Sequence, residues 1–329
     1  MNAKQAIHRI FLSLILVSAS CLLPFASVAQ DKFPSKPIKL VVPYAPGAIT
    51  DTAARLFAEH LSHALGQQVV IENRGGAGTR IGMQYVASAP ADGYTLLYVN
   101  SITHGTMPAM SKSLAFDPVK DFSPIAPLFW YANIFLCHPS VQAKNIQELI
   151  AFAKANPDKL TNATAGPGSG HDFIGSYFKS LTGVKILHVH YKGGGPALQD
   201  VLAGHVSCIY GDGNAKSLVE SGKLRAFATA GPARDPVYPN VPTMDESGLK
   251  GFSMPINHGF AAPANTPASV IARLNAAANE ALKQPALVQR ARDLGLSIYG
   301  GGQEKLAQII NSDLTKFVKI AEDANIPKE

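Results

Sequence analysis

The sequence has few of the features that mark a redox centre, a nucleic-acid interface or an integral membrane domain. Only 3 of its 329 residues are cysteine, and no Cys-x-x-Cys spacing is present, so neither a redox motif nor a zinc motif is indicated. Charged residues make up 16% of the chain, and the basic residues behind its formal net charge of +6 are scattered. This does not match the clustered basic patch of a nucleic-acid-binding protein. Beyond the N-terminal segment, no apolar run is long enough to span a bilayer, and no repeat of fixed period is apparent.

The N-terminal segment has the layout of a secretory signal peptide. Lys4 and Arg9 form a basic stretch, residues 10–25 are apolar, and small residues follow at 26–29. Because about 16 apolar residues are fewer than the roughly 20 of a membrane-spanning helix, we expect residues 1–29 to be removed by cleavage after Ala29. A retained membrane anchor and a lipoprotein anchor at Cys21 remain alternatives. The mature chain is predicted to be periplasmic.

Two cysteines remain after this cleavage, Cys137 and Cys208, and both lie in apolar, strand-like segments. A disulfide can persist in a periplasm, so a bonded pair is one possibility. Two buried, unpaired thiols are the interpretation that the sequence favours.

About 300 residues remain in the mature chain, enough for two lobes of ordinary domain size. Hydrophobic residues make up 47% of the sequence, which is typical of a well-buried core and argues against disorder. Strands are predicted at 38–43, 69–72 and 94–99. A helix is predicted at about 50–65, with Gly66 placed to cap its end. This alternation predicts an α/β fold with a parallel sheet covered on both faces.

The pattern restarts after a loop rich in proline and polar residues. Further strands are predicted at 134–138, 160–165, 186–191, 206–210 and 224–229, with helices at 146–156 and 172–181. Helices at 267–283 and 304–324 have no complete sheet of their own to cover, so we expect them to return to the first lobe. The predicted division is residues 30–135 plus 259–329 for one lobe and 136–258 for the other, with crossing strands at 134–138 and 259–262.

Two strand–glycine loop–helix junctions, one in each half, are the strongest local signal. The first contains Gly47-Ala48-Ile49-Thr50-Asp51, and the second runs from Gly166 through Gly168, Ser169 and Gly170 to His171. A helix start carries unpaired backbone N–H groups and about half a positive charge, so it attracts an anion without a cationic side chain. In open α/β sheets, ligands bind beyond the carboxyl ends of the strands, where such loops lie. The alternative is that these residues only cap helices or form a tight turn.

Patterns that suggest catalysis or metal binding are weaker. Ser169, His171 and Asp172 are adjacent at a helix start and cannot converge as a catalytic triad must. His188 and His190 alternate on a strand as metal ligands might, but no acidic partner is apparent, and ordinary half-buried histidines are the favoured interpretation. The prediction is therefore no catalytic residue, no metal and no cofactor.

An ordered set of motifs resembles one protein family over essentially the whole mature chain. The motifs are Pro37-Ile38-Lys39-Leu40-Val41-Val42-Pro43, Val70-Ile71-Glu72-Asn73-Arg74, Asp92-Gly93-Tyr94, Phe116-Asp117-Pro118, His138-Pro139-Ser140, His188-Val189-His190-Tyr191-Lys192-Gly193, Gly222-Lys223-Leu224-Arg225-Ala226, Val241-Pro242-Thr243 and Ala262-Pro263-Ala264-Asn265-Thr266-Pro267. Together they are similar to the Bug family, the periplasmic receptors related to tripartite tricarboxylate transporters.

This resemblance implies a two-lobed type II periplasmic-binding-protein fold, with a ligand cleft between lobes joined by crossing strands. Family ligands are small carboxylates: dicarboxylates, tricarboxylates, acidic amino acids or aromatic acids. Mapped onto this chain, the resemblance implies ligand contacts from the two glycine loops and from Asn100, Ser101 and Thr103. Asp212 is a further candidate.

The chain departs from the family pattern near the expected site. Ala48 replaces a second glycine, the segment Gly211-Asp212-Gly213-Asn214 replaces an Asp-Asn-like pair, and Asn257-His258 replaces an aromatic residue. The roles of His171, Asp212 and His258 therefore stay open, and so does the identity of the acid.

The expected function is that of a monomeric, non-enzymatic receptor. It would capture a small carboxylate by lobe closure and deliver it to membrane subunits of a tripartite tricarboxylate-type transporter. The alternative is a ligand sensor that presents its closed form to a periplasmic signalling partner.

Overall fold

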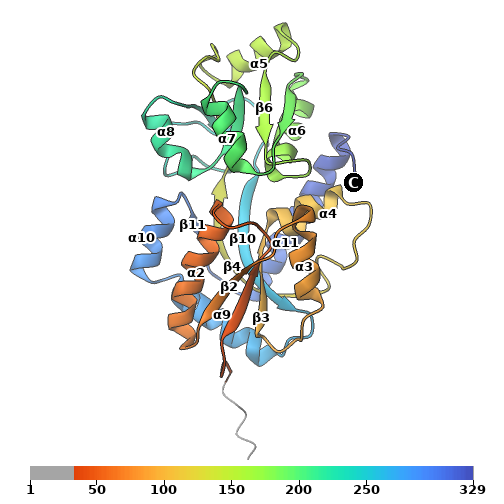
Figure 1. Ribbon diagram of the computed structural model, residues 1–329, viewed down its shortest axis with the longest axis vertical. Helices are drawn as coiled ribbons and strands as arrows, with labels where there is room; N and C mark the ends of the chain where they lie inside the picture. Colours follow the sequence, from red (N-terminus) through yellow and green to blue (C-terminus); the bar gives the residue numbers. More distant parts are fainter. Residues whose placement is uncertain (1–32, 329) are drawn as a thin grey trace, which may run out of the picture. The chain divides into compact units, whose positions relative to one another are not determined.

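A computed structural model describes residues 33–328 of the chain, and the predicted signal peptide at residues 1–29 lies outside them. All the helices and strands described below belong to one unit, which begins at Lys36. Within it, two β-sheets with their own helices form two lobes, and Figure 1 shows the strands that connect them. Among residues 33–328, no helix is both long and apolar enough to cross a membrane.

The first sheet has the strand order β11-β4-β10-β3-β1-β2. Its strands are β1 (Ile38–Val42), β2 (Val69–Asn73), β3 (Thr95–Asn100), β4 (Phe122–Ala132), β10 (Pro255–Pro263) and β11 (Ser297–Ile298). The strands β2, β1 and β3 are parallel, but β10 runs antiparallel to β3 and β4, and β11 runs antiparallel to β4. The predicted parallel arrangement of the first three strands is therefore confirmed, and the whole sheet is mixed because β10, which re-enters it from the other lobe, runs antiparallel to its neighbours β3 and β4.

The second sheet has the order β7-β6-β8-β5-β9. Its strands are β5 (Ile134–Cys137), β6 (Thr161–Thr164), β7 (Leu187–His190), β8 (Cys208–Gly211) and β9 (Arg225–Thr229). In this sheet β6 runs parallel to β7 and β8. The strand β5 runs antiparallel to both of its neighbours, β8 and β9. The chain passes between the sheets at Asn133 and returns after β9 and before β10.

Helices pack on both sheets. They are α2 (Ile49–Leu65), α3 (Arg80–Ala87), α4 (Met107–Met110), α5 (Ile146–Ala155), α6 (Gly170–Thr182), α7 (Gly194–Leu202), α8 (Lys216–Glu220), α9 (Ala268–Ala281), α10 (Pro285–Asp293) and α11 (Gln303–Asp323), with short turns η1 (Ala77–Thr79), η2 (Ile102–Thr106) and η3 (Gly213–Ala215). Gly66 ends α2 in the left-handed conformation, with its N–H directed at the carbonyls of Ser62 and His63. This confirms the predicted C-cap.

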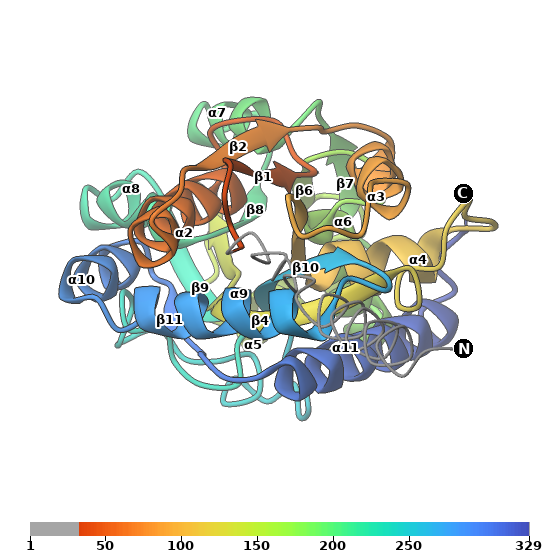
Figure 2. The ribbon, with the colours of Figure 1, turned by 90° about the horizontal axis from the view of Figure 1, so that it is seen from below.

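The C-terminal helices return to the first sheet, as predicted, and α11 also reaches the second lobe. Figure 2 shows α9 and α11 beside β4, and both helices contact that strand. Leu306 and Ile310 of α11 belong to the first lobe's core. Further along the helix, Phe317 packs against Phe173 of α6, with ring centroids 5.2 Å apart. One helix therefore joins the cores of both lobes.

Cys137 and Cys208 form a disulfide between β5 and β8. The two residues are direct partners in the antiparallel register of these strands, which places their side chains on the same face of the sheet. The interpretation that favoured two unpaired thiols was wrong, because residues 71 positions apart in the sequence become neighbours only through strand pairing.

Candidate functional site

A buried carboxylate shapes the first glycine loop, which follows β1. Asp51 is 3% exposed. Its Oδ2 accepts the backbone N–H of Gly47 at 3.0 Å and the Nε–H of Arg55 at 2.9 Å, and its Oδ1 accepts the Asn73 amide at 2.8 Å. Burial alone would raise the pKa of Asp51, but the hydrogen bonds from Arg55, Asn73 and Gly47 hold it below the usual value. Asp51 is thus ionised near neutral pH, and its carboxylate is used within the first lobe.

The start of α2 leaves backbone N–H groups for a ligand. The first backbone hydrogen bond into this helix runs from Thr52 N–H to the Ala48 carbonyl. Among the described residues, the N–H groups of Ile49 and Thr50 have no acceptor. Gly47 has φ +99°, which side-chain-bearing residues rarely adopt, and an added Cβ there would meet nothing within 4 Å. The loop therefore exposes Gly47 and Ala48 beside unpaired N–H groups.

The second glycine loop follows β6 and repeats this arrangement. Ser169 caps α6 by accepting the Asp172 N–H on its Oγ at 3.3 Å. Asp172 Oδ2 accepts the Gly168 N–H at 3.1 Å, and Oδ1 lies 2.6 Å from His188 Nδ1. Gly166 and Gly168 have φ of +119° and +71°, conformations that glycine adopts without strain.

The two loops share one design. In each, a carboxylate four residues after a glycine accepts that glycine's N–H: Asp51 with Gly47, and Asp172 with Gly168. Both carboxylates occupy the third position of their helix. In each case the carboxylate is held from the other side, by Arg55 and Asn73 in the first lobe and by His188 in the second. Burial would raise the pKa of Asp172 as well, and the bonds from His188 and Gly168 lower it.

Asn100, at the end of β3, organises a third turn at the same end of the first sheet. Its Oδ1 accepts the Tyr44 hydroxyl at 2.7 Å and the N–H groups of Ile102 and Thr103 at 3.1 and 3.3 Å. Thr103 Oγ1 in turn accepts the Asn100 N–H and donates to its carbonyl. Asn100 and Thr103 are fully buried. Their side chains fix the turn between β3 and η2.

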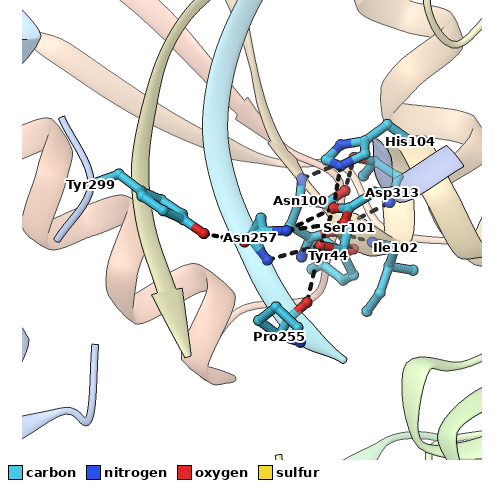
Figure 3. A network of polar contacts seen from close by, with 10 residues as sticks. Tyr44, Asn100, Ser101, Ile102, His104, Pro255, Asn257, Tyr299 and Asp313 are labelled. Carbon is cyan, nitrogen blue, oxygen red and sulfur yellow. Dashed lines mark hydrogen bonds and ion pairs between the residues drawn. The ribbon is translucent and has the colours of Figure 1, made fainter. Parts of the chain in front are cut away.

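Ser101 continues this turn into a buried polar network (Figure 3). Its hydroxyl donates to Asp313 Oδ2 of α11 at 2.6 Å and accepts the Asn257 N–H at 2.8 Å. Asp313 also accepts the Asn257 amide, and His104 Nε2 lies 3.0 Å from Oδ2. Tyr299 donates to Asn257 Oδ1 at 2.7 Å. Burial opposes ionisation of Asp313, but the bonds from His104, Asn257 and Ser101 hold its pKa below the usual value.

Two of the residues whose roles the sequence left open, His258 and His171, are neutral histidines. His258 is 1% exposed, and its Nδ1 lies 2.9 Å from the Tyr98 hydroxyl. Burial, with a smaller effect from His104, lowers its pKa to about 3, so the ring is neutral. His171 is partly exposed but has a buried Nδ1, and desolvation lowers its pKa to about 4.

Asp212 caps the start of η3 in the second lobe, where its Oδ1 accepts the Asn214 N–H at 2.9 Å. Burial raises the pKa of this carboxyl. Its charge in turn raises the pKa of Tyr131, although burial of Tyr131 is the larger cause. Asp212 of the second lobe therefore lies near Tyr131 of the first lobe.

The two lobes contact each other near the second glycine loop and near η3. A Cβ added to Gly170 would lie 3.1 Å from Ile102 Cδ1, and one added to Gly213 would lie 2.8 Å from the Leu294 carbonyl oxygen. Ile102 is also the residue whose N–H reaches Asn100, which binds Tyr44 of the first loop. Ile102 therefore lies between the two predicted loops.

One cavity and one pair of histidines are further candidate sites. A cavity of about 150 Å³ in the first lobe has a mostly apolar lining that includes Met83, Val99, Phe122 and Ile310. His188 and His190 bond to Asp172 and to Thr164 Oγ1, and within residues 33–328 no group of three or more histidine, cysteine or acidic side chains could hold a metal ion.

The sequence analysis did not identify Tyr44 or Asp313 as site residues. It also did not identify Asp172 as the carboxylate that holds the Gly168 N–H. The signal for Asp172 was available, since it repeats the Gly-x-x-x-Asp spacing of the first loop. The predicted ligand contacts at both loops and at Asn100, Ser101, Thr103 and Asp212 lie at one end of each sheet, and as ligand contacts they stay predictions.

Comparison with known proteins agrees with a two-lobed binding protein. Residues 53–326 match the model of a protein family described as "Tripartite tricarboxylate transporter family receptor". The structure of the periplasmic binding protein BugD is similar over 90% of this chain and 100% of that chain, with TM-score 0.82 and 33% identity. Rpa4515 of R. palustris with adipate has TM-score 0.84 and 30% identity over 90% and 100% of the two chains. MatC from Rhodopseudomonas palustris with bound malate has TM-score 0.80 and 35% identity over 88% and 99%.

The two-lobed α/β fold and its similarity to solved periplasmic binding proteins define this chain as a solute-binding receptor of the type II periplasmic kind. The matched description covers most of the sequence, and the solved relatives align with nearly all of the described residues. The chain belongs to the tripartite tricarboxylate transporter receptor family, whose relatives include the Bug proteins. This family consists of periplasmic solute-binding receptors, and the resemblance inferred from the sequence motifs is confirmed.

Proposed function

We propose that this chain is exported to the periplasm, captures a small organic carboxylate between the loops at Gly47–Asp51 and Gly166–His171, and delivers it to transporter membrane subunits. It acts as a monomer and catalyses no reaction. The observation that carries this proposal is the paired geometry of the loops, in which Asp51 and Asp172 each hold a glycine N–H at the start of a helix.

Backbone N–H groups suit this ligand because they supply positive potential without a mobile side chain. The starts of α2 and α6 each present the positive end of a helix dipole. The charge of Asp51 is offset by its ion pair with Arg55, at 2.9 Å, so the first loop does not carry an uncompensated negative charge. A dicarboxylate spanning the cleft would place one carboxylate at each loop.

Two solved relatives support the ligand class. Rpa4515 is solved with adipate and MatC with bound malate, and both compounds are dicarboxylates. Delivery to membrane subunits is supported by the family description, which names a transporter receptor. Export is supported by the signal-peptide pattern at residues 1–29 and by the periplasmic family.

Closure of two lobes around the ligand completes the proposal. We assign residues 30–135 plus 259–329 to one lobe and 136–258 to the other, with the boundaries moved by the observed sheets: Ile134 and Phe135 belong to β5 of the second sheet, and residues 255–258 belong to β10 of the first. In the structure, Gly170 and Gly213 of the second lobe already approach Ile102 and Leu294 of the first, which is the arrangement expected of a closed receptor. Opening would separate these contacts by a hinge motion at the connecting strands.

A thermal-shift screen of the mature protein tests capture. The acids are malate, adipate, a tricarboxylate, glutamate and an aromatic acid, with uncharged sugars as controls. An acid present at 100 times its dissociation constant should stabilise the protein by about 2.7 kcal/mol. Stabilisation by sugars alone would overturn the carboxylate assignment.

Delivery is tested separately from capture. Cells lacking this receptor should lose uptake of the radiolabelled acid that binds, and should recover it with the wild-type gene. Unchanged uptake together with tight binding would reject delivery and leave capture standing.

A further inference from the structure

The second lobe contains a cluster of polar side chains beneath α6 that the two-loop site does not use. Asn162 of β6 and His188 of β7 are direct partners in the parallel register. Tyr210 lies two residues after Cys208, the β8 partner of Asn162. Because strand residues alternate between faces, these three side chains project from one face of the sheet, toward α6.

Four polar atoms of this cluster have no protein partner. They are Nδ2 and Oδ1 of Asn162, Nε2 of His188 and the hydroxyl of Tyr210, and none of them bonds to another group among the described residues. Asn162 is 2% and Tyr210 1% exposed. Buried polar groups are nearly always hydrogen-bonded, to protein or to ordered water. A cavity of about 10 Å³ adjoins all three side chains.

This cavity suits one water molecule. Its volume is near the smallest that holds a water, and a buried water needs two to four polar partners. Tyr210 and the Asn162 amide are donors, while Asn162 Oδ1 accepts. Burial keeps the Tyr210 hydroxyl protonated by raising its pKa. A metal ion is a poor occupant, since the cluster has a single imidazole and no carboxylate in the cavity lining.

The state of His188 completes the set. Its Nδ1 lies 2.6 Å from Asp172 Oδ1, and the pKa of that carboxyl is held low, so Nδ1 carries the hydrogen. In the neutral ring, Nε2 is then an acceptor. A water in the cavity can therefore donate to His188 and to Asn162 Oδ1, and accept from Tyr210 and Asn162 Nδ2.

We infer that the second lobe binds one internal water between Asn162, His188 and Tyr210, and that this water positions the second glycine loop through His188 and Asp172. The path is a sequence of contacts: the water holds His188, His188 Nδ1 holds Asp172 Oδ1, and Asp172 Oδ2 holds the Gly168 N–H. His188 and Asp172 are positioning residues in this scheme.

The first lobe does the same task without a water. There Asp51 is held directly by Arg55 and Asn73. In the second lobe the side chain that holds Asp172 is the imidazole of His188, whose orientation depends on what its other nitrogen meets. The inferred water therefore takes a place that protein side chains fill in the first lobe.

Gly175 of α6 keeps the space open. An added Cβ there would lie 2.8 Å from His188 Nε2 and 2.9 Å from Asn162 Nδ2. Alanine normally favours a helix over glycine, so a glycine at this point needs a packing reason. The close approach of these two polar atoms supplies it.

Water binding is tested first, without any ligand. A high-resolution crystal structure of the mature protein should show one spherical peak within hydrogen-bond distance of Asn162, His188 and Tyr210. Direct bonding among the three side chains, or a cavity without density, would overturn the inference. Neither result depends on the proposed function.

Gly175→Ala tests the space, with Gly195→Ala in α7 as its matched control, because a Cβ at Gly195 meets nothing within 4 Å. The control should hold or raise the melting temperature through better helix propensity. Gly175→Ala should lower it and displace the water. Equal effects of the two substitutions would count against the crowded site.

The positioning role rests on the proposed function and is tested by two substitutions of His188. Asn can replace the Nδ1–H that reaches Asp172, while Gln places its amide nearer the position of Nε2. We expect His188→Asn to keep ligand affinity within a few-fold and His188→Gln to weaken it about tenfold, since a hydrogen bond to a charged group is lost. The opposite order, or equal affinities, would reject the path through Asp172. Absence of carboxylate binding by the wild-type protein would instead reject the proposed function and leave the water assignment to the crystal.

Discussion

Asp313 of α11 accepts hydrogen bonds from the side-chain amide of Asn257 on β10, with Nδ2 3.1 Å from Oδ1 and 2.9 Å from Oδ2. This pair joins the last long helix to the strand by which the chain re-enters the first sheet. Ser101 and His104 bond to the same carboxylate, so the turn after β3 is fixed by segments far apart in the sequence. The first lobe's end of the candidate site depends on this one buried charge.

Replacing Asp313 by asparagine should destabilise the protein strongly. The substitution keeps the size of the side chain but removes the charge that His104, Ser101 and Asn257 share, and breaking a buried, hydrogen-bonded pair typically costs about 3 kcal/mol. Urea unfolding measures the loss. Asp323→Asn on the same helix is the control, because its pair with Lys319 is largely exposed and should contribute at most about 0.5 kcal/mol. Similar losses for the two variants would contradict the network's importance.

Removing the disulfide should also lower stability. The bond between Cys137 and Cys208 links residues 71 positions apart, and the chain-entropy relation gives about 4 kcal/mol for a loop of this length. The double variant Cys137→Ala with Cys208→Ala should show this loss in urea unfolding, and a reductant should have no further effect on it. Two titratable thiols in the untreated mature protein would show that the bond does not form.

Local patterns predicted the longest helices and the parallel strands. The helix predicted at about 50–65 is observed at Ile49–Leu65, and the one at 304–324 at Gln303–Asp323. Their apolar spacing and end signals are properties of adjacent residues. β4 was missed and read as a loop, because Pro124 and Pro127 cannot donate to a ladder and are rare in central strands. The structure accommodates them where the register with β10 shifts.

The glycine loops could be predicted because each lies within a few consecutive residues. The partners that hold the site could not, because they come from distant segments: Tyr44 bonds Asn100 56 positions away, and Ser101 bonds Asp313 212 positions away. One local signal existed for Asp313. It lies on the buried face of α11 between Ile310 and Phe317, where a charge needs buried partners.

Acid should destabilise the protein partly through His258. Burial lowers its folded-state pKa to about 3, below the ordinary value of about 6.5. The unfolded chain therefore binds a proton that the folded chain does not, and the stability contributed by the neutral ring is lost as pH falls from about 6.5 toward 3. Between pH 7 and pH 5 this loss amounts to about 2 kcal/mol.

His258→Asn should remove this part of the pH dependence. The asparagine amide can take the place of Nδ1 beside the Tyr98 hydroxyl but does not titrate. The measured quantity is the difference in unfolding free energy between pH 7 and pH 5, so a constant destabilisation by the substitution cancels. A difference equal to that of the wild-type protein would show that His258 is not buried in its neutral form.

Gly168→Ala should weaken ligand binding more than it weakens the fold. Gly168 has φ +71° and so does Gly222, where an added Cβ meets nothing within 4 Å. Both substitutions force alanine into the left-handed region, at a cost of about 1–2 kcal/mol. Only Gly168 donates its N–H to the Asp172 clamp. Calorimetry with the acid that binds should give about a tenfold higher dissociation constant for Gly168→Ala, and an unchanged one for Gly222→Ala. Equal affinities would place the ligand away from the second loop.

Closure of the lobes should depend on the contact between Gly170 and Ile102. A Cβ on Gly170 would lie 3.1 Å from Ile102 Cδ1, so the branched side chain of Gly170→Val would act as a wedge between the lobes while leaving the N–H groups of the second loop in place. Small-angle scattering should show that saturating ligand lowers the radius of gyration of the wild-type protein relative to its ligand-free state. The radius of gyration of Gly170→Val should be the same with and without ligand. Adding Ile102→Ala to Gly170→Val returns the space that valine takes, and should therefore restore contraction and affinity together. If the double variant stayed open, the defect would lie in the loop itself, and the approach of Gly170 to Ile102 would not be the contact that limits closure.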